Sequence, residues 1–457
     1  SAFQMPLEYQ STCVGHRRGA RDGPPVPVQG AAWIRTCSSR LFTASASRLL
    51  KVPRSVRRNC PPLRASVTHS SRGTRAVDSI SVRAAGWPGA PVPDGVRSCA
   101  RRVTRTGSRP PGQCGDCPAG HLAGNDIQAL IDRSDLVVEC SGDVLHGTVV
   151  IDRVLAAGLP VVTMDAELHV TTGSYFVDRG LLTEAEGDQP GCLAALHEDA
   201  VAMGFSPLVY GNIKGFLNND PAADEMRYWA EKQGISLIQV TGATDGTKVQ
   251  IEQALVANGL GARITQTGLS YLEAADIRSA GNTLAALASS RGTPLSDCIM
   301  SAPSPAAKLP VGVFITGTHN PEQQAALNYY KMGEGPYYTL LRPYYLPHLE
   351  IPKTIRRVLQ GGGALLNNGL QPQASVGTIA KRTLQPGELI VQGSGSFAVR
   401  GIALDIDEFP GHLPIGLMQQ ARIKRRIEAG DLLMMDDIEL PDSLAIRAWQ
   451  AILDRRR

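Results

Sequence analysis

The sequence predicts an α/β protein that begins with part of a doubly wound parallel sheet, continues into an α+β portion and ends in a small β domain. Three observations support this order. Two apolar segments, 136–143 and 159–167, flank a helical pattern at 145–158. Helical and strand patterns then alternate through the middle of the chain. Short strands separated by turns fill residues 375–442.

The first 122 residues differ in composition from the rest of the chain. Residues 1–120 carry 19 basic and 5 acidic residues, although the whole chain of 457 residues has a net charge of only +4. They are rich in Arg, Pro and Ser, and show no sustained periodicity. Three interpretations compete: a basic disordered tail, an organellar transit peptide and an out-of-frame translation of GC-rich DNA. We favour the third, and expect this region to be poorly structured.

The ordered part is expected to open with one crossover unit. Segment 136–143 reads as a buried strand, 145–158 as a helix ended by a glycine, and 159–167 as a second buried strand. Ligands of open parallel sheets bind at the carboxyl ends of the strands, where this sequence places polar side chains. The residues predicted there to bind a cofactor are Glu139, Ser141, Gly142, Thr163, Asp165 and Glu167.

A first unit with a G-x-G-x-x-G turn, which would hold a pyrophosphate at a helix N-terminus, is not legible ahead of residue 124. The segment 393-GSGSFA-398 is close to that pattern, but no amphipathic helix follows it, and we interpret it as a chance match. Either the nucleotide-binding half is damaged in this chain, or the protein binds no dinucleotide.

Five longer segments carry a family resemblance. They are 187-GDQPG-191, 211-GNIKGFLN-218, 244-TDGTKVQIEQALVANG-259, 331-KMGEGPYYTLLRPYYLPHLEIP-352 and 375-SVGTIAKRTLQPGELI-390. Over residues 124–457 the chain resembles the bacterial 1-deoxy-D-xylulose 5-phosphate reductoisomerase-like oxidoreductases. The resemblance implies a homoserine-dehydrogenase-like, Rossmann-type domain for NADP or NAD, a catalytic domain and a C-terminal β-clip domain of the SAF type. It also implies reduction and isomerisation of a phosphorylated deoxy-sugar in isoprenoid biosynthesis for one branch.

The domain boundaries expected on this basis are 1–122 for the anomalous region, 123–168 for the remaining half of the Rossmann domain, 169–350 for the catalytic domain, and 351–457 for a return segment with the SAF-like domain. Homoserine dehydrogenases end their second strand here with Thr-Ala-Asn-Lys, whereas this chain has Ala166 in place of the lysine. We therefore expect the catalytic lysine elsewhere.

The helix that follows Thr247 supplies the leading candidates. Thr247 and Gln250 fit a capping box, and Asp245 is an alternative cap. Lys248 and Glu252 are four residues apart and share a face. They could form a solvent-facing ion pair of little consequence. The Ala- and Gly-rich surroundings favour burial instead, and a carbonyl reductase needs a cation or acid where negative charge develops. We assign Lys248 this role, with its basicity tuned by Asp245 and Glu252.

Further candidates come from the other family-like segments. Lys214 lies in a glycine-flanked loop after a strand, where it could stabilise an oxyanion or anchor an anion. Asp188 could bind substrate or merely cap a helix over 191–204. His348 and Glu350 alternate along a segment read as extended, so they are expected to face the same side. The residues assigned to substrate binding are Asp188, Gln189, Asn258, Arg342 and His348. No metal ligands are assigned, although a divalent metal is compatible with the family.

The expected protein is a cytoplasmic, homodimeric NAD(P)H-dependent oxidoreductase that reduces a small polar carbonyl compound, with or without a phosphate group. It is expected to bind no nucleic acid. It is also expected not to bind membranes, since no run of 18 apolar residues occurs. Two alternatives remain open. The C-terminal domain could make it a carbohydrate-binding protein, or the chain could be an inactive fragment whose nucleotide-binding half is damaged.

Overall fold

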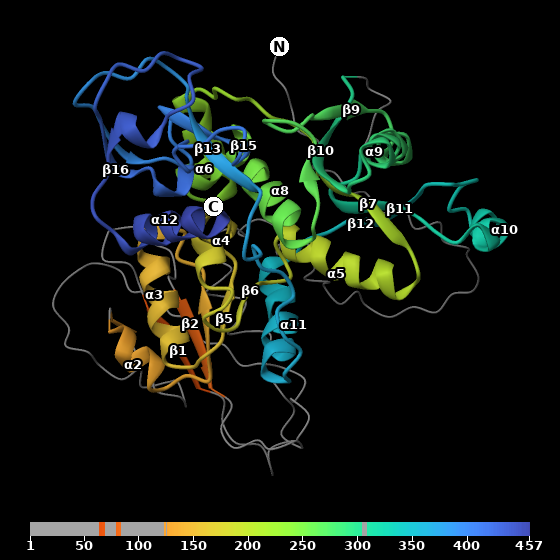
Figure 1. The fold of residues 1–457 in the computed structure, drawn as a ribbon, viewed down its shortest axis with the longest axis horizontal. Coiled ribbons are helices and arrows are strands. Elements are labelled where there is room, and N and C mark those ends of the chain that lie inside the picture. Colours follow the sequence, from red (N-terminus) through yellow and green to blue (C-terminus); the bar gives the residue numbers. More distant parts are fainter. Residues whose placement is uncertain (1–63, 69–78, 84–122, 125, 304–308) are drawn as a thin grey trace, which may run out of the picture. The chain divides into compact units, whose positions relative to one another are not determined.

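The computed structural model describes residues 64–68, 79–83, 123–124, 126–303 and 309–457, all of which belong to one unit, Cys37–Arg457 (Figure 1). Most of the anomalous region 1–122 therefore lies outside the described residues, and the predicted domain boundaries remain predictions. Two strands do come from that region, β1 (Arg64–Thr68) and β2 (Ser79–Arg83). They pair antiparallel with each other and join the first sheet.

The predicted crossover unit is present in the first sheet. Strand β4 (Leu136–Glu139) leads through helix α3 (Val144–Ala156) to β5 (Val161–Thr163), and β6 (Leu182–Glu184) lies beyond it. These three strands are parallel, and the sheet order is β3-β1-β2-β4-β5-β6, where β3 is Ala123–Gly124. On the other side of β4, β2 runs antiparallel to it. Among the described residues ahead of β4, no glycine-rich turn joins a strand to a helix.

Helices cover both faces of this sheet because its strands are apolar on both faces. Val137 and Val161 pack with Val150 and Ile151 of α3. The opposite face, with Leu136, Val138 and Val162, packs against Ile351 and Ile355 of α11 (Pro347–Leu359). The segment around His348 and Glu350 is therefore helical, and the prediction of an extended segment is wrong. Pro347 occupies the first helical turn, where its missing N–H costs nothing.

The second sheet is mixed and forms the α+β portion, with the strand order β12-β11-β7-β10-β8 and β9 beside β10. Strand β7 is parallel to β10 and antiparallel to β11. Helices α5 and α9 pack on this sheet. The bounds are β7 (Ser206–Lys214), β8 (Arg263–Ile264), β9 (Leu272–Ala274), β10 (Leu295–Ser301), β11 (Gly312–Thr318), β12 (Tyr338–Arg342), α5 (Gln189–Ala202) and α9 (Ile277–Arg291).

Helix α8 (Thr247–Gly259) lies at the centre of the described unit. It contacts α4 (Ala166–Thr172), α5, β10 and the C-terminal strands β13 and β15. Its buried residues run continuously from Val249 to Ala257, so nearly every face of the helix is covered. A helix that is covered all round belongs to a core. The expectation that this Ala-rich helix is buried is confirmed.

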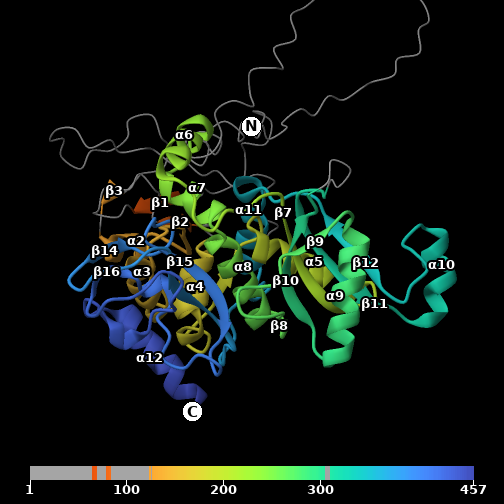
Figure 2. The same cartoon turned by 90° about the horizontal axis from the view of Figure 1, so that it is seen from above.

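The C-terminal part consists of short strands closed by a final helix. The two phrases of the weak repeat, 380–390 and 423–433, pair with each other, since Leu384 and Ile427 exchange both backbone hydrogen bonds. The segment 393–398 lies between β14 and β15, with no helix after it. Helix α12 packs back onto α3 and α4 (Figure 2). The bounds are β13 (Ala374–Ala380), β14 (Leu389–Gln392), β15 (Val399–Asp405), β16 (Gln419–Ile423), β17 (Ile438–Glu439) and α12 (Leu444–Arg456).

Four shorter helices complete the described part: α2 (Ile127–Ile131), α6 (Ala223–Gln233), α7 (Leu237–Thr244) and α10 (Gln324–Tyr329). Helix α7 begins with a complete capping box formed by Ser236 and Gln239, and it leads directly to the turn before α8. No helix in the described ranges combines the length and apolar character needed to cross a membrane.

Candidate functional site

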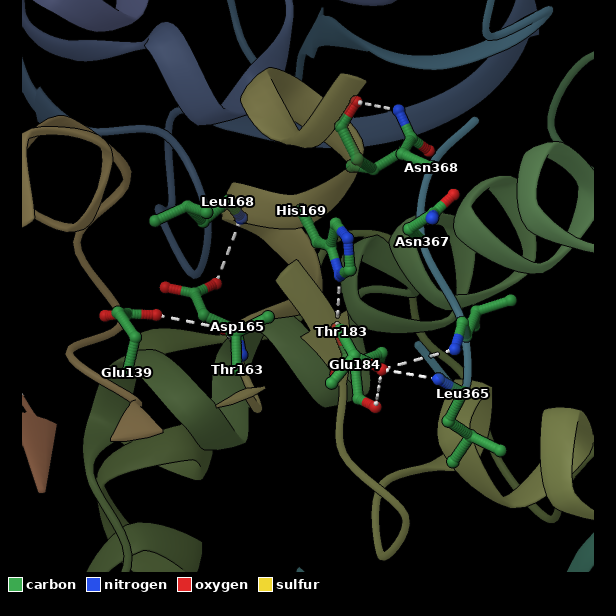
Figure 3. Close-up of polar contacts among 12 residues, drawn as sticks. Glu139, Thr163, Asp165, Leu168, His169, Thr183, Glu184, Leu365, Asn367 and Asn368 are labelled. Atoms are coloured by element: carbon green, nitrogen blue, oxygen red, sulfur yellow. Dashed lines mark hydrogen bonds and ion pairs between the residues drawn. The ribbon is translucent and has the colours of Figure 1, made fainter. Parts of the chain in front are cut away.

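The carboxyl ends of three parallel strands meet at one edge of the first sheet. Glu139 ends β4 and pairs in register with Thr163 at the end of β5, which in turn pairs with Glu184 at the end of β6. Glu139 Oε2 accepts a hydrogen bond from Thr163 Oγ1 at 3.0 Å (Figure 3). Its Oε1 accepts one from the backbone N–H of Ser141 at 2.8 Å. The predicted polar edge therefore exists.

Asp165 begins α4 at the same edge. One of its oxygens accepts the backbone N–H of Leu168 at 3.1 Å, which caps the helix. The other, Oδ2, is buried and has no hydrogen-bond partner among the described residues. Gly142 has φ +66°, a conformation that favours glycine, in the turn between β4 and α3. The six residues predicted to bind a cofactor thus lie at the ends of β4 and β5 or in the residues that follow them.

The carboxyl groups of this edge are held away from water. Burial, with Asp165 as a second cause, raises the pKa of Glu139 to about 8. The same two causes raise the pKa of Glu167 to about 8. Burial raises the pKa of Asp165 to about 6. At neutral pH, Glu139 and Glu167 therefore hold protons and can donate hydrogen bonds to a ligand.

A pH dependence of stability follows from these shifts. An acid whose pKa is higher in the folded chain than in the unfolded chain binds more protons when folded, so stability falls as pH rises between the two values. For Glu139 this window runs from 4.5 to about 8. The lowered pKa values of His169 and His412 oppose it only below about 6.5. We expect the free energy of unfolding to fall from pH 6.5 to pH 8, as measured by urea denaturation.

The variant Glu139→Gln is expected to reduce that slope by up to about 1.4 kcal/mol per pH unit, the value for one proton. The exposed Glu231 of α6 serves as the control, and Glu231→Gln is expected to leave the slope unchanged. An equal slope in wild type and Glu139→Gln would mean that Glu139 is already ionised at neutral pH.

A buried pair of Glu184 and His169 lies beside this edge, and the sequence prediction missed it. His169 Nδ1 lies 2.8 Å from Glu184 Oε2, and both side chains are fully buried (Figure 3). Burial lowers the pKa of His169 to about 3 and raises that of Glu184 well above its usual value. His169 is therefore uncharged at neutral pH, and Glu184 is shifted toward its protonated form. Glu184 could have been found because, like Glu139, it is an acid at the end of a short apolar strand.

Lys248 and Glu252 belong to a second cluster, on helix α8. Lys248 Nζ lies 3.0 Å from Asp188 Oδ1 and 3.4 Å from Glu252 Oε1. Burial disfavours the charge on Lys248, but Asp188 and Glu252 outweigh that effect and raise its pKa. Glu252 is fully buried, so the alternative of a solvent-facing pair is wrong. The Lys248 side chain is 45% exposed and is therefore open to a ligand.

Lys214 and Asn212, at the end of β7, approach Glu252 from the other side. Asn212 Nδ2 donates to Glu252 Oε2 at 2.7 Å, and Lys214 Nζ lies 3.4 Å from the same oxygen. Gln189 lies between them. Oriented to satisfy its neighbours, its amide donates to Asp188 and to Glu252 Oε1 at 3.1 Å, and accepts from Lys214 at 3.1 Å. Predicted residues from three separate segments therefore meet here, together with Asn212, which was not predicted.

Asp188 links the two groups of residues. It holds the N-cap position of α5 but makes no capping hydrogen bond, and binds Lys248 instead. The expectation that it merely caps is therefore wrong. Its charge raises the pKa of Glu184, and that of Lys248 lowers it. Asp188 and Lys248 are thus near enough to the end of β6 to influence Glu184 electrostatically.

Asp245 is separated from this chemistry. Its Oδ2 lies 2.6 Å from Lys381 Nζ in an ion pair that is almost completely buried, and its Oδ1 accepts the backbone N–H of Thr247. Lys381 also donates to the carbonyl of Ser396 at 2.6 Å. Asp245 therefore orders the start of α8 and does not contact Lys248. The Thr247–Gln250 capping box is also wrong, since Gly246 is the N-cap.

Asn258 has no capacity left for a substrate. Its Nδ2 donates to Asn368 Oδ1 and to the carbonyl of Ala374, and its Oδ1 accepts the backbone N–H groups of Gln373 and Ala374, all at 2.9 Å. These four bonds join α8 to the start of β13 and to the segment before it. The assignment of Asn258 to substrate binding is therefore replaced by a structural role.

The variant Asn258→Ala is expected to lower the free energy of unfolding by about 1–3 kcal/mol, because it leaves buried backbone groups without partners. Urea denaturation measures the loss. Turnover per folded molecule should be unchanged. A raised KM at unchanged stability would return Asn258 to the substrate site.

Arg342 and His348 also depart from their predicted roles. Arg342 is enclosed by two carboxylates: it bonds to Glu350 and lies 2.7 Å from Glu186 Oε1. Its charge is thereby used inside the protein and is not presented to a phosphate. His348 lies on α11, where residues two apart point about 200° from each other. His348 and Glu350 therefore do not share a side, and Glu350 alone faces the interior.

Among the described residues, no group of three or more His, Cys, Asp or Glu side chains has the arrangement of a metal site. The acids at the strand ends bond to Ser141, Thr163, Leu168 and His169.

Comparison with known proteins agrees with an enzyme of this general kind. Residues 187–351, which contain Asp188, Lys214, Lys248 and Glu252, match the family described as "Oxidoreductase DRL, catalytic domain". A search of curated sequences finds no match.

Two solved structures show a low likeness. A "putative myo-inositol dehydrogenase" from Sinorhizobium meliloti 1021 has 11% identity and a TM-score of 0.26, over 53% of this chain and 76% of its own. A "putative oxidoreductase" from Bacteroides fragilis NCTC 9343 has 12% identity and a TM-score of 0.23, over 55% and 79%. Neither is close enough to bear on the fold or the function. On the family match, the general class of this protein is that of an oxidoreductase.

Proposed function

We propose that this protein reduces the carbonyl group of a small polar substrate with NADPH or NADH. The observation that carries the proposal is the position of Lys248, a half-exposed cation fixed between Asp188 and Glu252 beside the carboxyl ends of three parallel strands. Hydride transfer to a carbonyl places negative charge on oxygen, and a preorganised cation stabilises that charge.

The strand edge fits the nicotinamide end of such a cofactor. Asp165 Oδ2 is a buried acceptor without a partner, and can accept a hydrogen bond from the carboxamide N–H₂ of a nicotinamide. Glu139 is protonated at neutral pH and can donate one. When bound, the reduced nicotinamide would supply the hydride. Side chains of the edge would orient its ring toward Lys248.

The lysine cluster, with Lys248 of α8 and Lys214 of β7, binds and orients the substrate. Lys248 points its ammonium group at the carbonyl oxygen, while Asp188 and Glu252 keep that group charged. Lys214 offers a second cation for an anionic substituent such as a phosphate. A phosphorylated hydroxyketone of the 1-deoxy-D-xylulose 5-phosphate type suits this pair of lysines, because it offers a carbonyl oxygen to Lys248 and a phosphate to Lys214.

The test uses the full chain. We expect NADPH or NADH to bind in isothermal titration, and its absorbance to fall when 1-deoxy-D-xylulose 5-phosphate or another small hydroxyketone or aldehyde is added. The variant Lys214→Met should raise KM for phosphorylated compounds more than for neutral ones. If neither nucleotide binds, the proposal is wrong.

A further inference from the structure

Reduction of a carbonyl requires a proton as well as a hydride, and Lys248 is poorly suited to give one. Asp188 and Glu252 lie within 3.4 Å of its ammonium group and raise its pKa. A general acid works best when its pKa is near the working pH. Lys248 therefore stabilises the oxyanion as a permanent cation, and the proton must come from another group.

Glu184 has the geometry of that group. It ends β6, in register with Thr163 at the end of β5, and its side chain is fully buried. One oxygen, Oε2, lies 2.8 Å from His169 Nδ1. The other, Oε1, has no hydrogen-bond partner among the described residues, although a buried carboxyl oxygen without a partner is costly. That cost would be relieved by a bound molecule that bonds to Oε1.

We propose that Glu184 is the acid that protonates the reduced carbonyl oxygen, with His169 as the residue that positions it. The inference rests on the proposed function and names the proton donor of that reaction. Glu184 would touch the reacting oxygen and act as a catalytic residue. His169 would act through Glu184 and act as a positioning residue.

The step balances as follows. The hydride pair, supplied by the reduced nicotinamide, forms a C–H bond at the carbonyl carbon, and the π pair of the C=O bond moves to oxygen. The proton of Glu184 forms the O–H bond of the alcohol. The nicotinamide leaves oxidised, and Glu184 is left as a carboxylate. Solvent returns a proton to Glu184 after the product departs.

The charges around Glu184 favour its protonated form before the reaction. Burial raises its pKa first, and the carboxylates of Asp188 and Asp165 raise it further, against a smaller effect of Lys248. His169 is uncharged and adds no positive charge. The titratable groups that face Glu184 are Glu139 of β4, Asp165 before α4, His169 of α4, Asp188 before α5 and Lys248 of α8.

His169 is fixed by its surroundings. Its ring lies against Gly173, the residue that follows α4, where a side chain would collide with it. The ring nitrogen Nε2 has no hydrogen-bond partner among the described residues, so the bond to Glu184 is the only hydrogen bond that the ring makes with this part of the chain. That single bond sets the orientation of the carboxyl group.

The first test needs only the oxidised cofactor. The positive ring of NADP⁺ placed near Glu184 should lower its pKa and release its proton. An indicator dye in unbuffered solution measures protons released as NADP⁺ saturates the full chain. We expect Glu184→Gln to release about one proton fewer than wild type. The control Glu231→Gln, on the exposed face of α6, should match wild type.

The second test follows turnover with NADPH and the carbonyl compound reduced in the assay above. Wild-type kcat should fall as pH rises through the pKa of Glu184. Glu184→Gln should lower kcat by about 10²–10⁴-fold at little change in KM, and kcat should no longer fall with rising pH. Glu184→Asp should restore part of the rate and part of this pH dependence. His169→Gln should shift the pH at which kcat falls without raising KM, which a purely structural residue would not do.

The outcomes separate the two proposals. If neither NADP(H) nor NAD(H) binds, the proposed function fails and the role of Glu184 fails with it. If a nucleotide binds and Glu184→Gln releases as many protons as wild type, the proposed function stands and Glu184 is not the acid. The same conclusion follows if kcat of Glu184→Gln still falls with rising pH.

Discussion

Lys248→Met is expected to lower kcat for carbonyl reduction by about 10²–10³-fold, the range for loss of one preorganised group that stabilises an oxyanion. The loss is expected to reach the upper end of this range, because Asp188 and Glu252 would then face the developing oxyanion without a cation between them. Steady-state kinetics with NADPH measures it.

The fold should survive this change. Glu252 keeps its contacts with Asn212 and Lys214, and the Lys248 side chain is half exposed. Lys248→Arg, which keeps the charge, should retain more activity than Lys248→Met, and Lys424→Met at an exposed site should behave as wild type. Unchanged turnover in Lys248→Met would remove this lysine from the mechanism.

Lys381→Met is expected to lower the free energy of unfolding by about 3–5 kcal/mol, because it leaves the buried carboxylate of Asp245 without its partner. The ion pair joins Lys381, which follows β13, to Asp245, which lies two residues before α8. Its loss should therefore also loosen the first turn of α8. Urea denaturation measures the change in stability, and amide exchange at the start of α8 measures the loosening.

The double variant Lys381→Met with Asp245→Asn provides the control. It removes the unpaired charge, so most of the lost stability should return. Together with the single variant Asp245→Asn, it completes a double-mutant cycle that gives the interaction energy of the pair. A loss below about 1 kcal/mol in Lys381→Met would place the pair among the weak surface ion pairs, in conflict with its burial.

Sequence patterns identified the elements that carry the site. The apolar strands that end in Glu139 and Thr163 were recognisable because each is short and bounded by polar residues. The helix that carries Lys248 and Glu252 was recognisable from its position after a glycine turn and its Ala-rich body. The sequence also indicated that Lys214 and Asp188 belong to the site, although no pattern showed that they meet at Glu252.

The errors have a common physical cause. Asp245, Asn258 and Arg342 are polar residues in family-like segments. The sequence predicts tuning of Lys248 by Asp245, and substrate binding by Asn258 and Arg342. Each instead has protein partners far away in the sequence: Lys381, Gln373 and Glu186. A buried polar group must be satisfied by some partner, and local sequence does not say whether that partner is a ligand or another segment.

The region 331–352 shows how tertiary packing overrides a local pattern. Its end was read as extended because His348 and Glu350 alternate with apolar residues. In the structure, Ile351, Ile355 and Val358 form one helical face that packs on the first sheet. Burial of that face against β4 and β5 selects the helix, and Pro347 permits it to begin there.

The sequence by itself determined the class of the elements, the two apolar strands with polar ends, and the central helix with an acid one turn after a lysine. Those features depend on periodicity and on neighbours within a few residues. Only the tertiary structure decided that Glu184 and His169 form a buried pair, that Asp188 binds Lys248 and that Asp245 binds Lys381. These contacts join residues up to 136 positions apart, and side-chain partners at such separations are selected by packing of the whole unit and not by the local chain.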